Sequence, residues 1–279
     1  MNRKLRTGEK IGLWLSRVAI WVALVFALFP ALWVVTASFQ PGMAFYSSSL
    51  IPHKFTLANY IYVFTQTDFW LWVKNSLIVA GVTALVQMLV TASSAYAFSR
   101  MRFPGRKFGL MGLLLLQMLP STMALAAIYT LLVRLHLLGS LLGLILVFCG
   151  ASAYNIWLFK GYIDSLPREL DEAAYADGAT HWQIFTRIIL PLARPMLAVQ
   201  FIWSFTGIYN EYMLSSLVLQ SPKTYTVAVG LQRFIANQYS AHWTYFAAGA
   251  TVASVPILIV YMTLQRHLES GLTRGAVKG

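Results

Sequence analysis

Six long apolar stretches constrain the fold of this 279-residue chain more than any other feature. A helix needs about 17 to 25 predominantly apolar residues to cross the hydrocarbon core of a bilayer, and each stretch meets that length. Charged residues make up 11% of the chain, against about 25% in soluble globular domains. We therefore expect an all-α integral membrane protein with a single transmembrane domain over residues 1–279. The six expected spans cover residues 18–39, 75–99, 108–133, 137–159, 195–219 and 244–265.

Positive charge is distributed unevenly between the segments that join these stretches. The chain has 21 Lys and Arg residues against nine Asp and Glu, a formal net charge of +12. Sixteen of the basic residues fall on the side of the N-terminus and five on the other side. Connections rich in Lys and Arg stay in the cytoplasm, so both termini of this multi-pass chain are expected there, with outer loops at residues 40–74 and 220–243. This distribution accounts for the charge without a nucleic-acid partner.

The longest connection on the expected cytoplasmic side covers residues 160–194 and mixes both charge signs. A helix is expected to begin near Pro167, because proline suits a first helical turn and acidic residues follow it closely. Asp177-Gly178 is expected to end this helix, since glycine tolerates the left-handed conformation of a helix C-terminus.

A second short helix is expected directly after this turn. Thr180 and Gln183 have the spacing of a capping box. The apolar residues that follow recur at helical spacing, and Pro191 is expected to stop the run. These apolar residues are Ile184, Phe185, Ile188 and Ile189. The segment therefore predicts a helix, a tight turn and a helix, which is either a plug for a groove on a partner or a plain link between two spans.

The chain lacks the residue patterns of common catalytic sites. Its five histidines are scattered singly, without a HExxH pair or cysteines at metal-ligand spacing. The GxxxxGK[ST] phosphate loop is also absent from the sequence, so energy from ATP would have to come from a partner. We expect a protein that is not an enzyme and that binds no metal and no cofactor itself.

Polar residues inside the expected spans are the candidates for a solute path. Glu211 is the one acidic residue well inside a span, where it is costly unless it faces a partner or water. We expect it to face other helices and to hydrogen-bond within the sequence YNEY, which also contains Asn210. Gln117 and Asn155 add neutral amides, which suit uncharged polyhydroxylated solutes. Interhelical hydrogen bonding without a transport role is the alternative.

Three prolines lie inside the expected spans. Pro30, Pro120 and Pro256 are expected to interrupt the first, third and sixth of them, since proline removes a backbone donor.

The second outer loop is rich in side chains that hydrogen-bond and stack. We expect it to contact a docked protein or the solute which that protein delivers, although a solvent-exposed loop is the alternative. The candidate contact residues are Gln232, Asn237, Gln238 and Tyr239.

The stretch EAAYADGATHWQIFTRIILPLARP, residues 172–195, resembles the EAA loop of ABC-importer permeases. The matching positions, including the DGA extension of the carbohydrate branch, are Glu172, Ala173, Ala174, Asp177, Gly178, Ile188, Leu190 and Pro191. AYAFSRMRFPG, TYTVAVGLQRF and the ending QRHLESGLTRGAVKG are similar to the smaller channel subunit of maltose-type importers. The resemblance extends over nearly the whole chain.

This resemblance implies a type I ABC-importer permease fold in which the EAA loop is a cytoplasmic coupling helix. It also implies three kinds of protein partner: a second homologous permease subunit, two ATPase subunits that bind ATP and Mg²⁺, and an extracytoplasmic sugar-binding protein. The expected location is a bacterial or archaeal inner membrane, where the chain contacts membrane lipid. The expected function is ATP-driven import of carbohydrate, of the maltose or maltodextrin kind. The tail, residues 269–279, is expected to be ordered only in the assembled transporter.

Other functions are compatible with an apolar chain of this kind. A secondary transporter would show internal repeats and coupling acids within the spans, and an integral-membrane enzyme would need a catalytic constellation. An ABC permease for a different sugar or a polyol would share all of these sequence features.

Overall fold

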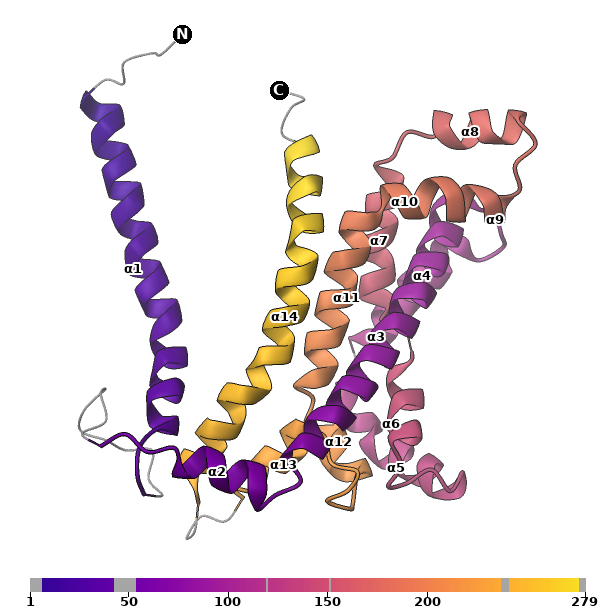
Figure 1. The fold of residues 1–279 in the computed structure, drawn as a ribbon. Coiled ribbons are helices and arrows are strands. Elements are labelled where there is room, and N and C mark those ends of the chain that lie inside the picture. The colour runs from indigo at the N-terminus through magenta and orange to yellow at the C-terminus, as the bar shows by residue number, and fades with distance from the viewer. Residues whose placement is uncertain (1–6, 43–53, 119, 151, 237–240, 276–279) are drawn as a thin grey trace. The chain divides into compact units, whose positions relative to one another are not determined.

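The computed structural model describes residues 7–42, 54–118, 120–150, 152–236 and 241–275 (Figure 1). Within these ranges the chain forms helices and no strand, as expected from the sequence. Contacts between residues divide it into two units. The first combines residues 1–67 with 231–252, and the second combines residues 68–230 with 253–279.

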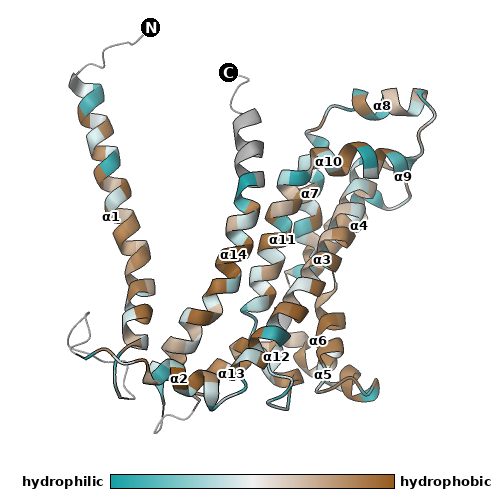
Figure 2. Ribbon diagram, in the orientation of Figure 1, coloured by the Kyte–Doolittle hydropathy of each residue, from teal (hydrophilic) through white to brown (hydrophobic). Residues whose placement is uncertain are grey.

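Three helices are long and apolar enough to cross a membrane without interruption. They are α1 (Thr7–Ser38), α3 (Phe69–Arg100) and α14 (Trp243–Gly275). Hydrophobic residues predominate along the middle of α1 and α14 in Figure 2. Most large side chains of α1 are exposed, as expected of a helix whose surroundings are lipid or another membrane subunit.

Three further apolar segments are pairs of shorter helices that meet at a sharp bend. The described helices provide up to six membrane spans if each bent pair is counted as one. The chain bends by 80° between α4 (Arg106–Gln117) and the segment that contains α5 (Leu125–Arg134). It bends by 50° between α6 (Leu141–Phe148) and α7 (Ala153–Asp164). The segment 181–192 and α11 (Arg194–Tyr209) meet at 79°.

The remaining elements are short and connect or extend these helices. They are α2 (Ala58–Thr65), η1 (Ser121–Ala124), α8 (Glu169–Ala176), α9 (His181–Ile184), η2 (Phe185–Ile189), α10 (Leu190–Leu192), α12 (Met213–Val218) and α13 (Val227–Gln232).

The prolines act differently from one another. Pro120 lies at the break between α4 and η1, as expected. The prediction that Pro30 and Pro256 interrupt their spans is wrong, because both lie inside the continuous helices α1 and α14. One proline removes a single backbone hydrogen bond, and in apolar surroundings the neighbouring backbone groups are satisfied best by continuing the helix.

The tail also differs from expectation. Helix α14 continues to Gly275, so residues 269–275 are helical in the isolated chain, while residues 276–279 lie outside the described residues.

A buried amide organises the end of α1 in the first unit. The side-chain nitrogen of Asn59 on α2 donates to the carbonyl oxygens of Ser38 and Gln40, at 2.8 Å in each case. The hydroxyls of Ser38 and Tyr60 are 2.6 Å apart. Carbonyls at the end of a helix lack partners within it, and here α2 provides them.

Helix α3 is the centre of the second unit, and α7 and α11 pack against it (Figure 1). Its buried residues include many small ones, which allow helix backbones to approach closely inside a membrane. Among them are Ala80, Thr83, Ala84, Ala92 and Ala95.

Candidate functional site

The segment with the EAA sequence forms two short helices joined by a tight turn, as predicted. Three acidic residues occupy the first turn of α8, which begins at Glu169, two residues after Pro167. Gly178 follows α8 with φ +81°. The N–H of Ala179 donates to the carbonyl of Ala174 at 2.9 Å, and that of Gly178 donates to Tyr175 at 3.0 Å. This pair of bonds is a Schellman motif, and it depends on the left-handed residue between them.

The second helix begins with the predicted capping box. The side chain of Thr180 accepts from the N–H of Gln183 at 3.3 Å, and the Gln183 side chain accepts from the N–H of Thr180 at 2.8 Å. Both ends of the turn are therefore determined by local hydrogen bonds, which makes the turn rigid.

The prediction that Pro191 stops this helix is wrong. The chain continues as a π-turn, η2, followed by α10, and it bends only at Ala193 before α11. Proline lacks an N–H, so the carbonyl of Arg187 loses its normal α-helical partner at position 191. A single wide turn at this point keeps the helix going. Together the two short helices, their turn and this extension make up residues 169–192, which we call the hairpin.

The apolar side of the hairpin is buried against the end of α3 and α7. Ile184 and Ile189 are fully buried, in a cluster that includes Tyr96 of α3 and both Phe159 and Ile163 of α7. The second helix therefore rests on the protein's own spans, as its spacing predicted.

The first helix of the hairpin leaves most of its surface exposed. Its inward side consists of the buried Asp171 and the half-buried Ala174. The other residues singled out from the sequence in this helix and turn, Glu172, Ala173, Asp177 and Gly178, are exposed. Leu190 in α10 is half-buried, and Pro191 is exposed. Ala174 and Leu190 thus pack inward, whereas the remaining five of these residues are exposed to solvent.

An ion pair buried under α8 was missed from the sequence. Arg100 at the end of α3 places Nε 2.6 Å from Oδ2 of Asp171, and the two side chains are 5% and 8% exposed. Arg100 also donates from Nη2 to the carbonyl of Leu166 at 2.9 Å. A long membrane helix and the exposed helix of the hairpin are therefore joined by one guanidinium.

Aromatic and polar groups extend this contact. The hydroxyl of Tyr175 on α8 hydrogen-bonds Nδ1 of His181 on α9, and the hydroxyl of Tyr96 lies 3.5 Å from the same nitrogen. A second carboxylate, Asp164 at the end of α7, accepts from Ser99 at 2.5 Å and pairs with Lys160 at 2.5 Å. The hairpin, α3 and α7 are thus connected at several points.

Two amides inside the expected spans have partners from other helices at a helix break. The Gln117 amide donates to the hydroxyl of Ser152 at 2.6 Å and accepts from the N–H of Tyr154 at 2.9 Å. Gln87 of α3 donates to the carbonyl of Phe148 at 2.6 Å. These amides satisfy backbone and hydroxyl groups beside the α6–α7 break, where the helix cannot do so itself.

Asn155 and Asn210 lie near two different breaks. The half-buried side chain of Asn155 makes no hydrogen bond with any residue that the structure describes. Asn210 is exposed and donates to the carbonyl of Thr206 at 3.0 Å. The structure thus brings Gln117 and Asn155 to the start of α7 and places Asn210 at the end of α11.

Glu211 lies in the break between α11 and α12 and has the expected hydrogen-bonding role, although its partners belong to α12 rather than to YNEY. Its carboxylate accepts from the N–H of Leu214 at 2.7 Å and from the N–H and hydroxyl of Ser215 at 3.0 and 2.7 Å. These partners belong to the next turn of the chain, and the side chain is half-exposed. A carboxylate is favourable at a helix N-terminus because it accepts from the free N–H groups there.

The start of the segment after α12 is bound tightly to the beginning of α3. Asn75 donates to the carbonyls of Lys223 and Tyr225 at 3.0 and 2.9 Å, and Ser76 accepts from the N–H of Val227 at 2.7 Å. Trp72 donates to the carbonyl of Pro222 at 3.0 Å. Residues 222–227 therefore form an ordered segment, which we call the platform.

The candidate contact residues of this loop follow the platform. Gln232 is half-buried at the end of α13, while Asn237, Gln238 and Tyr239 lie outside the described residues.

Comparison with known proteins identifies the family. The model of the family "Binding-protein-dependent transport system inner membrane component" matches residues 89–274, which is more than half of the chain. The chain belongs to this family of permeases. Family membership makes it a transport component of an inner membrane rather than an enzyme.

Curated relatives match this permease over its full length. It is 40% identical to the galactooligosaccharides transport system permease protein GanQ of Bacillus subtilis, over 100% of both chains. It is 38% identical to the maltose/maltodextrin transport system permease protein MalG of Vibrio vulnificus, over 97% of both chains. The permease is 37% identical to the maltodextrin transport system permease protein MalD of Streptococcus pneumoniae, again over 100% of both chains.

A solved structure shares the fold of the permease. The crystal structure of a bacterial ABC transporter that imports the acidic polysaccharide alginate contains a chain with a TM-score of 0.78 and 21% sequence identity. The match covers 95% of the permease and 99% of that chain. The expected all-α importer permease fold is confirmed.

Proposed function

We propose that this permease forms one half of the channel of an ATP-driven importer for uncharged oligosaccharides of the maltodextrin or galactooligosaccharide kind. The relatives with 37 to 40% identity are permeases of such systems by name. A second homologous permease would form the other half of the channel.

We place both termini and the hairpin in the cytoplasm, where the positive charge of the chain is concentrated. Two ATPase subunits would bind ATP and Mg²⁺ there, and this chain would bind neither. An extracytoplasmic sugar-binding protein would dock at the other side, near the platform after α12 and the residues that follow it, Gln232, Asn237, Gln238 and Tyr239. The family description, with its dependence on a binding protein, supports this arrangement.

One observation supports the coupling role most directly. Glu172 and Ala173 of helix α8 are exposed to solvent, as is Asp177 directly after it, and the buried pair of Arg100 and Asp171 supports the helix from the other side. A narrow, exposed helix that is rigidly tied to a membrane helix can transmit force from a bound partner to the spans. We infer that closure of the ATPase subunits moves α8, and that the ion pair and the turn at Gly178 carry this movement to α3 and α11.

Reconstitution of the permease with its partner subunits and binding protein tests this function. Uptake of a labelled maltodextrin or galactooligosaccharide should require both ATP and the binding protein. Uptake driven by an ion gradient without ATP would instead indicate a secondary transporter. ATP-dependent uptake of only a polyol or another sugar would support the function as an importer but contradict the proposed substrate.

A variant at the exposed face of α8 tests the coupling role separately. Ala173→Arg should prevent docking of the ATPase subunits because a long charged side chain replaces a methyl group at the contact. Ala173→Ser, the matched control, keeps the helix narrow and should assemble and transport normally. Normal uptake by Ala173→Arg would overturn the proposed contact.

A further inference from the structure

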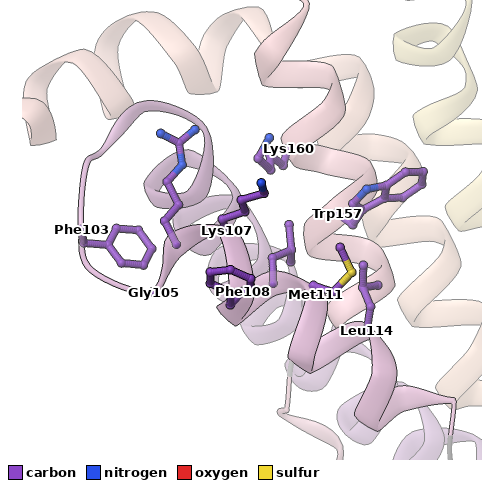
Figure 3. A pocket seen from close by; sticks show the side chains of 10 residues that line it. Phe103, Gly105, Lys107, Phe108, Met111, Leu114, Trp157 and Lys160 are labelled. Carbon is purple, nitrogen blue, oxygen red and sulfur yellow. The ribbon is translucent and has the colours of Figure 1, made fainter.

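A cavity of about 710 Å³ lies beside the start of α4 and the end of α7 (Figure 3). Its lining combines basic residues with large apolar ones, and both helices contribute to each kind. In Figure 3, the amino groups of Lys107 and Lys160 lie on the same side of the cavity, and Met111, Leu114 and Trp157 lie on the other.

The basic side of the cavity carries an excess of positive charge. Lys107 is exposed and has no ion pair or hydrogen bond with any residue that the structure describes. Lys160 pairs with Asp164. Arg106 donates to the carbonyls at the end of α3, at 2.7 to 3.2 Å, and has no ion pair within the described chain. Three basic residues thus line the cavity, and within the described chain a carboxylate pairs with Lys160 alone among them.

The apolar side of the cavity is exposed. Trp157 is 50% exposed, Met111 58% and Phe108 78%, although each is a large hydrophobic side chain. They lie at the ends of two expected membrane spans, at the level where lysine side chains extend to the headgroups and tryptophan prefers the interface. A ligand that covers this surface has to be apolar at one end and anionic at the other.

We propose that this cavity binds one anionic phospholipid. Its headgroup phosphate would lie between Lys107 and Lys160, and its acyl chains would lie along Met111, Leu114 and Trp157. Basic pockets between membrane helices on the cytoplasmic side are suited to such headgroups. A helix of a partner subunit could cover the apolar surface, but its apolar face would leave the amino group of Lys107 without an anion. A phosphatidylcholine headgroup would bring its own cation next to the lysines.

Native mass spectrometry of the assembled transporter tests the proposal. The complex is purified in mixed micelles that contain equal amounts of dioleoylphosphatidylglycerol and dioleoylphosphatidylcholine, and the lipids that remain bound are counted. The unmodified complex should retain more phosphatidylglycerol than phosphatidylcholine. Lys107→Gln should lower this preference about fivefold, because one basic residue near an anionic lipid contributes about 1 kcal/mol. Trp157→Ala should lower retention as well, through lost contact with the acyl chains.

Arg102→Gln is the matched control, since Arg102 is an exposed basic residue of the same connection that does not line the cavity. It should leave retention unchanged in a complex that assembles normally. Equal retention of the two lipids by the unmodified complex would overturn the proposal, as would an equal loss in Arg102→Gln. A photoreactive group at position 108 should label lipid, and labelling of a protein subunit instead would identify a partner as the occupant.

Discussion

Nε of Arg100, at the last residue of α3, lies 2.6 Å from Oδ2 of Asp171 in the first turn of α8, with both side chains almost fully buried. A membrane helix is thereby connected to the exposed helix of the hairpin through a salt bridge. A buried pair of this kind contributes little net stability when it is complete, but the loss of one partner leaves an unpaired buried charge. The two residues are therefore expected to move together.

We expect Asp171→Ala to cost about 3 to 5 kcal/mol of the free energy of unfolding, because it leaves the Arg100 guanidinium buried without its carboxylate. Unfolding of the purified complex in SDS measures this cost. Lys160→Met breaks the more exposed pair with Asp164 and should cost about 1 kcal/mol or less. Equal costs for the two variants would contradict the role assigned to burial.

Gly178→Val should separate ATP hydrolysis from sugar uptake or prevent assembly with the ATPase subunits. The residue has φ +81°, and a non-glycine residue in this conformation costs about 1 to 3 kcal/mol. The spans should still insert, since the strain is confined to the turn. Gly178→Asn is the control, because asparagine tolerates the left-handed conformation best after glycine. Normal transport by the valine variant would show that the turn is not needed for coupling.

Glu211→Leu should destabilise the α11–α12 break more than Glu211→Gln does. The carboxylate accepts three hydrogen bonds from Leu214 and Ser215. Leucine accepts none, and each donor left unpaired away from water costs about 1 to 3 kcal/mol. Glutamine retains one acceptor oxygen, so its uptake rate and its stability should lie between those of leucine and the unmodified chain. Indistinguishable uptake and stability in the two variants would exclude a capping role.

Gly230→Ala should displace the platform that follows α12. A Cβ atom at this position would lie 2.2 Å from Cε3 of Trp72, which is far closer than two carbons can approach. The expected outcome is lower stability and weaker stimulation by the binding protein. A double-mutant cycle with Trp72→Leu measures the contact, since the smaller side chain should remove most of the penalty of Gly230→Ala. Additive effects of the two substitutions would contradict a direct collision.

The amino-acid sequence by itself determined the class of this protein and the local form of its hairpin. Long apolar runs with few charges exclude a soluble domain, because their burial requires a bilayer or another protein. The Gly178 turn and the Thr180 cap depend on hydrogen bonds between residues at most five positions apart, so their pattern is visible in the sequence. The prediction at Pro191 was wrong because one missing donor can be absorbed by a π-turn.

Only the tertiary structure decided where the spans break and what the polar residues inside them do. Hydropathy indicates how apolar a segment is, but it does not show where its backbone hydrogen bonds stop. Gln87 and Gln117 satisfy groups beside the α6–α7 break from other helices, and these partners follow from packing alone. The pair of Arg100 and Asp171 was likewise hidden, because nothing in the chain between them specifies that α8 folds back onto the end of α3. From the sequence alone, a charged residue is expected on a polar surface. Whether it is buried depends on how the helices pack against one another.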